Sequence, residues 1–160
     1  MSDRRWGSIL SLVRQGFSLE REFGARTIEE LVSLAELVEE SVYARGSLEG
    51  STGGLNFRLL NPPLRTGAFA SLRIVLDGIP IAEERIRVRS GDGAAWRTAT
   101  EIDRDRPLEM RPGQPTEVRI DGARPSPGSE VHLRLELQSI AIPPLVWLEI
   151  TDVVRGVAGP

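Results

Sequence analysis

Few residues in this sequence could carry chemistry, and their spacing limits what they could do. His132 is the only histidine, and in the alternating run 130–137 it shares a strand face with Glu130, Arg134 and Glu136. A histidine between two glutamates is a candidate general base or half of a metal site. Because no motif supplies a nucleophile beside it, we instead interpret these residues as cross-strand charge pairs on a solvated face.

A second candidate is the acidic cluster Glu101, Asp103 and Asp105, which superficially resembles a calcium ligand set. The glycine and the glutamate that a calcium loop needs at its sixth and twelfth positions are missing. Arg104 and Arg106 alternate with the carboxylates and can neutralise them directly. We therefore expect an exposed, ion-paired edge and no metal ion.

Arginines at alternate positions offer a third candidate, a stripe of positive charge. Three alternate along one predicted strand, and a fourth lies across the hairpin signalled by Asp77-Gly78. They are Arg85, Arg87 and Arg89, with Arg73 as the fourth. Such a stripe suits an anionic ligand or an acidic protein surface. A solvated face paired with Glu83 and Glu84 is the alternative. For Trp96 and Trp147, core packing is expected in preference to stacking on a sugar.

The composition removes several classes of function. The 160 residues include no cysteine, which excludes disulfides, thiolate nucleophiles and thiolate metal sites. All 20 basic residues are arginine, so no lysine is present for Schiff-base chemistry or a phosphate-binding loop. The glycine-containing stretches 51–54 and 90–93 also lack the strand-before, helix-after context of such a loop. We expect no enzyme activity, no catalytic residue and no cofactor.

The same composition bears on partners and location. A net charge of -3 does not favour nucleic acid. No run reaches the roughly 18 apolar residues of a membrane span, and residues 1–14 lack a signal-peptide pattern, so we expect a cytoplasmic protein. The arginine-only usage is typical of a GC-rich genome. Scarce Asn, Gln and Met together with 11 prolines also suggest a thermophilic source.

The elements that would position these residues divide near residue 50. Residues 1–46 have helical spacing and predict an N-terminal segment of two helices. Thr27 and Glu30 form a capping box at the start of the second helix, and Gly46 ends it. Its apolar stripe, a candidate interaction surface, consists of Ile28, Leu31, Ala35, Val38 and Val42. Residues 47–54 (SLEGSTGG) are predicted to form a flexible Gly/Ser linker.

From residue 55 to 155 the period of the apolar residues changes to two. Seven or eight short runs, separated by turn signals every 8–12 residues or so, predict a mainly β domain. The absence of helical segments between the runs argues against a parallel βαβ arrangement. We expect an antiparallel β-sandwich of the immunoglobulin-like or jelly-roll-like kind.

Three stretches of this domain carry a family resemblance. They are an opening strand (LNFRLLNPP), an Arg-x-Gly strand ending in Asp-Gly (RTGAFASLRIVLDG) and a Pro-Gly turn into a long strand (PGSEVHLRLEL). With them, residues 54–153 resemble the small β subunits of C-glycoside-deglycosidase-type heteromers. In that family the metal and the catalysis belong mainly to the larger subunit. The resemblance therefore implies an accessory role beside a barrel-type partner and no catalytic residue here.

Two functions follow as hypotheses. The first is a non-catalytic assembly or adaptor subunit, in which the sandwich is a platform and the amphipathic helix contacts a protein partner or a second copy. The second is a ligand-binding or accessory small subunit of a heteromeric enzyme. The sequence does not identify the small-molecule ligand.

Overall fold

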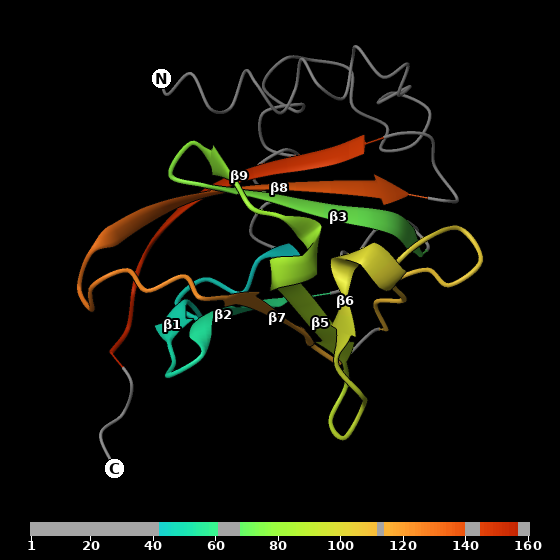
Figure 1. Cartoon of the computed structure of the whole chain (residues 1–160), viewed down its shortest axis with the longest axis horizontal. Coiled ribbons are helices and arrows are strands. Elements are labelled where there is room, and N and C mark those ends of the chain that lie inside the picture. The colour runs from blue at the N-terminus through green and yellow to red at the C-terminus, as the bar shows by residue number, and fades with distance from the viewer. Residues whose placement is uncertain (1–41, 61–67, 112–113, 140–144, 157–160) are drawn as a thin grey trace, which may run out of the picture.

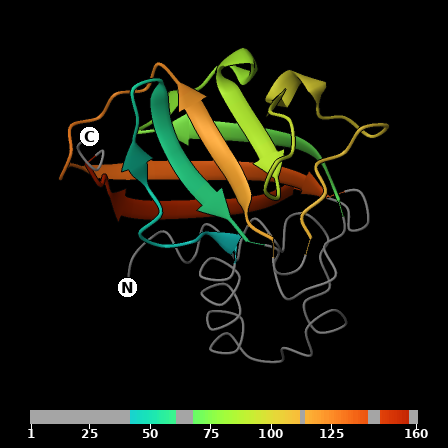
Figure 2. The same ribbon diagram turned by 90° about the horizontal axis from the view of Figure 1, so that it is seen from below.

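A computed structural model describes residues 42–60, 68–111, 114–139 and 145–156 of the chain. These residues form nine strands in two antiparallel sheets, which confirms the prediction of a mainly β, antiparallel protein (Figure 1). The five-stranded sheet, sheet A, has the order β1-β2-β7-β5-β6, and the four-stranded sheet, sheet B, has the order β4-β3-β8-β9. In a view from below, the strands of sheet A cross over those of sheet B (Figure 2).

The strand bounds follow the turn signals. Sheet A is built from β1 (Glu49–Gly50), β2 (Gly54–Leu59), β5 (Ile86–Ser90), β6 (Arg97–Thr98) and β7 (Thr116–Asp121). Sheet B contains β3 (Phe69–Leu76), β4 (Ile79–Pro80), β8 (Glu130–Ser139) and β9 (Leu145–Val153). Two short 3-10 helices are also present: η1 (Glu83–Arg85) precedes β5, and η2 (Ala99–Glu101) follows β6. The strand count exceeds the expected seven or eight, and three of the nine strands, β1, β4 and β6, are only two residues long.

Alternation along the strands creates the core. On β2, Leu55, Phe57 and Leu59 are buried, while the residues between them point outward. On β8, Leu133 and Leu135 likewise point inward and are fully buried. The inward residues of both sheets belong to one apolar cluster, because each sheet must cover the apolar face of the other.

The predicted linker at 47–54 is corrected by the structure. Leu48 is completely buried, Glu49–Gly50 form strand β1, and Gly54 already belongs to β2. The glycine at position 54 serves close packing, since a Cβ atom there would overlap the carbonyl oxygen of Ile120 on β7. The glycine content suggested a flexible segment, but the buried side chain of Leu48 is enough to anchor residues 47–54 to the core.

Most of the helical segment predicted over residues 1–46 lies in 1–41, outside the described residues. The predicted end of the second helix at Gly46 is wrong, because Tyr43 already forms a β-bridge with Leu59 and residues 45–46 form a turn. The chain that follows residue 41 is firmly attached to both sheets. Val42 is 2% exposed, and Tyr43 pairs with Leu59 at the end of β2. The Tyr43 hydroxyl donates a 2.9 Å hydrogen bond to Oδ2 of Asp152 on β9. Within the described part of the chain, no helix has the length and apolar character needed to span a membrane.

Candidate functional site

The outward surface of strands β2, β5 and β7 is rich in arginine, and we call it the arginine face. It arises because the apolar residues of these strands point inward and leave every second position to polar side chains. Its members are Asn56, Arg58, Arg87, Arg89, Glu117, Arg119 and Asp121. These strands therefore present four guanidinium groups and two carboxylates on the same surface.

One carboxylate holds two of these arginines together. Arg87 and Arg119 lie directly opposite each other on β5 and β7, which alone would be repulsive. Asp121 offsets this repulsion, because its two oxygens accept hydrogen bonds from Arg87 at 2.5 Å and from Arg119 at 2.8 Å. Burial opposes ionisation of Asp121, but the hydrogen bond from Arg87 and the charge of Arg119 outweigh it and lower its pKa.

An aromatic ring covers the next pair of cations. Arg89 is bonded to Glu117 with both Nε and Nη2 2.6 Å from Oε2. The guanidinium carbon atoms of Arg89 and Arg119 lie 4.7 and 5.1 Å from the centre of the Trp96 ring. Both distances are within the range of a cation–π contact. Trp96 is half-buried by these contacts and stands on the arginine face, so the expectation that it packs in the core is wrong.

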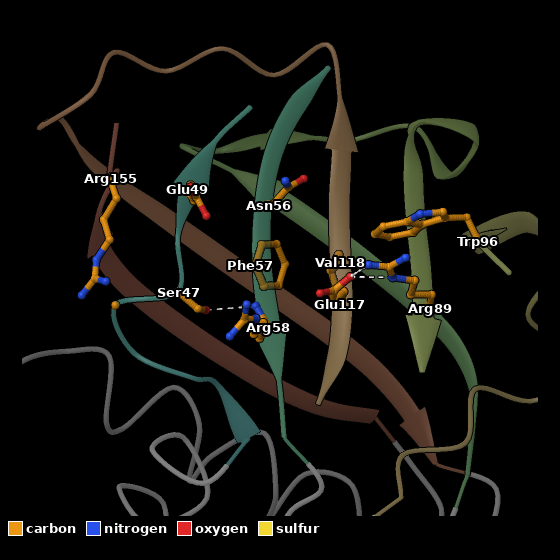
Figure 3. Close-up of a pocket in the computed structure, with 11 residues that line it drawn as sticks. Ser47, Glu49, Asn56, Phe57, Arg58, Arg89, Trp96, Glu117, Val118 and Arg155 are labelled. Atoms are coloured by element: carbon orange, nitrogen blue, oxygen red, sulfur yellow. Dashed lines mark hydrogen bonds and ion pairs between the residues drawn. The ribbon is translucent and has the colours of Figure 1, made fainter. Parts of the chain in front are cut away.

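Beside Trp96 a hollow of about 310 Å³ crosses the arginine face (Figure 3). Arg58 lines this hollow and forms no ion pair with any described residue, because its cross-strand neighbour Glu117 is engaged by Arg89. Asn56 also lines it, and its Oδ1 atom is buried without a hydrogen-bond partner among the described residues. An unpaired cation and an unsatisfied acceptor are features that a bound anionic group with an N–H or O–H donor would satisfy.

The predicted arginine stripe is only partly formed. Arg87 and Arg89 lie on β5 and face outward together as expected. Arg85 belongs to the turn η1, and its Nε donates a 2.9 Å hydrogen bond to the carbonyl oxygen of Asp121. Arg73 lies on sheet B, where Glu83 is 3.6 Å away. Including Arg73 was wrong, because β3 forms its hairpin with β4 in sheet B and β5 belongs to the other sheet.

Of the predicted apolar stripe, only Val42 lies within the described residues, and it is buried in the core of its own chain. Ile28, Leu31, Ala35 and Val38 lie outside them. The sequence reasoning also missed Asn56, Arg58, Glu117, Arg119 and Asp121 as members of one surface. Their alternation with buried residues was visible, but only the pairing of β7 between β2 and β5 brings them together.

The outward surface of sheet B, which we call the glutamate face, differs in charge. Its charged residues are Arg73, Glu130, Arg134, Glu136 and Glu149, and they accompany His132. Arg134 forms a 2.9 Å ion pair with Glu136, and Nδ1 of His132 lies 3.3 Å from the Thr151 hydroxyl. In the part of the chain that the structure describes, no group of three acidic or histidine side chains is placed to hold a metal ion.

The acidic cluster at 101–106 stabilises its own loop. Oδ1 of Asp103 accepts hydrogen bonds from the backbone N–H groups of Asp105 and Arg106 at 2.9 and 2.7 Å. The hydrogen bond from the backbone N–H of Arg106 is the main reason why the pKa of Asp103 is lowered. Glu101 instead completes a capping box with Thr98 at the start of η2. These contacts are those of a turn.

No family model matches the chain, and no curated protein matches it.

Proposed function

We propose that this protein is a non-catalytic assembly or adaptor subunit that docks an acidic segment of a partner protein on its arginine face. The observation that carries the proposal is the hollow beside Trp96, with its unpaired Arg58 and the unsatisfied Oδ1 of Asn56. A carboxylate side chain can pair with Arg58, and a peptide N–H can donate a hydrogen bond to Oδ1 of Asn56. We also propose a cytoplasmic location, and only the sequence supports it.

The charges of the two sheets favour binding of an acidic segment on sheet A. On sheet A, the cations of β2, β5 and β7 outnumber the carboxylates, whereas sheet B presents more glutamates than arginines outward. An acidic segment is therefore attracted to one side of the molecule and repelled by the other. We further propose that the two sheets form a sandwich of the immunoglobulin-like or jelly-roll-like kind, which would give the arginine face a rigid support.

Titration with a ten-residue glutamate peptide in low salt, followed calorimetrically, tests the proposal. Arg58→Glu is expected to weaken binding at least tenfold, because it reverses the unpaired charge in the hollow. Arg73→Glu is the matched control, since Arg73 is an exposed arginine of sheet B with a side-chain exposure of 68%. It is expected to change the Kd less than twofold.

Three results would contradict the proposal. They are no binding of the peptide at low salt, equal effects of the two substitutions, and tighter binding of a single-stranded oligonucleotide than of the peptide. Circular dichroism of each variant verifies that its fold is unchanged. Increasing salt is expected to weaken binding, because the contact is formed by solvent-accessible charges.

The same hollow supports a second candidate function, a ligand-binding accessory subunit of a heteromeric enzyme. The observation that favours it is the half-buried Trp96 at one end of the hollow, since an aromatic ring beside unsatisfied polar groups is suited to a hydroxyl-rich ligand. Co-purification with a larger barrel-type subunit would favour this function. The Trp96→Ala variant would then be expected to lose ligand binding but to keep the association with the larger subunit.

A further inference from the structure

We infer that the acidic segment docked on the arginine face is residues 29–40 of a second copy of this chain. The inference rests on the proposed docking function and names its occupant. That segment contains five glutamates, namely Glu29, Glu30, Glu36, Glu39 and Glu40. No arginine occurs from Thr27 to Ala44, so no basic residue of the segment offsets their charge.

The charges of the arginine face complement such a segment. Asp121 satisfies Arg87 and Arg119, and Glu117 satisfies Arg89, but Arg58 stays unpaired among the described residues. Ionised carboxylates accept hydrogen bonds strongly from guanidinium groups, and Arg58 is exposed. The buried Oδ1 of Asn56 requires a donor, which any backbone N–H or serine hydroxyl of the segment could provide.

The segment joins the described chain next to β2, one of the strands of the arginine face. Val42 is buried in the core, and Tyr43 pairs with Leu59, the last residue of β2, the strand that carries Asn56 and Arg58. The Tyr43 hydroxyl also donates a hydrogen bond to Asp152 of sheet B, so charge and not position decides between the sheets. Each copy therefore carries both a Glu-rich segment and an arginine face. Exchange between two copies makes both contacts twice in a closed, twofold pair, which is the commonest symmetry of oligomers.

The glutamate face is a poor alternative for the same segment. Its outward strands carry Glu130, Glu136 and Glu149, and its two arginines already have acidic neighbours. Docking five further glutamates there would bring like charges together. The sign of the charge therefore selects sheet A.

The test is the mass of the full-length chain in solution, measured by light scattering during size-exclusion chromatography. The wild type is expected to have twice the chain mass of 17.6 kDa at low salt. Both Arg58→Glu and the triple variant E36R/E39R/E40R are expected to raise the Kd of the dimer at least tenfold. Combining all four substitutions is expected to recover most of the lost affinity, because opposite charges again face each other.

Controls keep this result interpretable. Glu130→Arg and Arg73→Glu reverse exposed charges on the glutamate face and are expected to leave the dimer unchanged. If the triple arginine variant does not fold, E36Q/E39Q/E40Q provides a milder neutralisation and is expected to weaken the dimer in the same direction. A monomeric wild type, or a combined variant no better than either parent, would overturn the inference.

The inference and the proposed function can fail separately. A wild type that is monomeric but still binds the free glutamate peptide, with the loss at Arg58→Glu, would overturn the second-copy inference and support the docking function. A dimer that is insensitive to Arg58→Glu, together with no peptide binding, would overturn both.

Discussion

The outward faces of the two sheets have the same origin but carry opposite charge. In both sheets, alternate positions are apolar and point into one shared core, so the remaining positions become surface. In sheet A these positions hold mostly arginines. Asp121 and Glu117 pair with three of them, Arg87, Arg119 and Arg89, and Trp96 covers the last two. In sheet B these positions hold more glutamates than arginines, and His132 among them contacts a hydroxyl.

The comparison shows that polar positions on a strand acquire meaning only from their cross-strand neighbours. Arg87 faces Arg119, and only the shared Asp121 makes this arrangement favourable. Arg73 faces Glu136 across β3 and β8, so it contributes no excess charge. Two arginines that are equivalent in the sequence therefore differ in what they can bind.

The largest expected effect breaks the strand pairing that builds the arginine face. Gly54→Ala would place a Cβ atom against the Ile120 carbonyl and push β2 away from β7. We expect a loss of about 2–3 kcal/mol in the free energy of unfolding, measured by urea denaturation. The matched control Gly53→Ala has no atom within 4 Å of the new Cβ, so a change within about 0.5 kcal/mol is expected.

A second substitution tests the link between the two sheets. Tyr43→Phe keeps the buried ring but removes the hydroxyl that donates to Asp152 on β9. We expect a loss of about 1–2 kcal/mol, because a hydrogen bond to a charged acceptor disappears while Gly46 N–H still satisfies the carboxylate. Equal urea midpoints for the variant and the wild type would show that this bond contributes nothing to the link.

A smaller effect is expected from removing the aromatic cover of the arginine face. Trp96→Leu eliminates both cation–π contacts and leaves the Arg89–Glu117 pair in place. Because the site is partly exposed, we expect a loss of about 0.5–1 kcal/mol in thermal or urea denaturation. Binding of the glutamate peptide is expected to persist, which separates the role of Trp96 from that of Arg58.

The smallest effect concerns the pH dependence of stability. The pKa of Asp121 is lowered in the folded protein, so its contribution is fully present above the unfolded value of about 3.9. It is lost as the pH falls through the folded pKa. We expect Asp121→Asn to make stability less pH-dependent in this acidic range, by less than about 1 kcal/mol because the side chain is 28% exposed. Urea denaturation between about pH 2 and pH 6 measures this difference. A wild type and variant with parallel profiles would contradict the role of Asp121 as the shared partner.

The alternation of Leu55, Phe57 and Leu59, and of the leucines of β8, was sufficient to predict strands, their inward faces and an antiparallel arrangement. Turn signals such as Asp77-Gly78 located the ends of the strands, and both of these residues adopt the positive φ angles that this turn needs. These features are local, because burial period and backbone preference act within a few residues.

The candidate site depended on information that is not local. The sequence contains Arg73, Arg87 and Arg89 in similar surroundings, but the sheet order placed the first on one sheet and the other two beside β7. Likewise, the buried side chain of Leu48 anchors the segment predicted as a linker, and Glu49–Gly50 within it form the edge strand β1. Amino-acid order determined which side chains leave the core, whereas the tertiary structure decided which of them meet, because electrostatic and hydrogen-bond energies depend on distances between strands far apart in the chain.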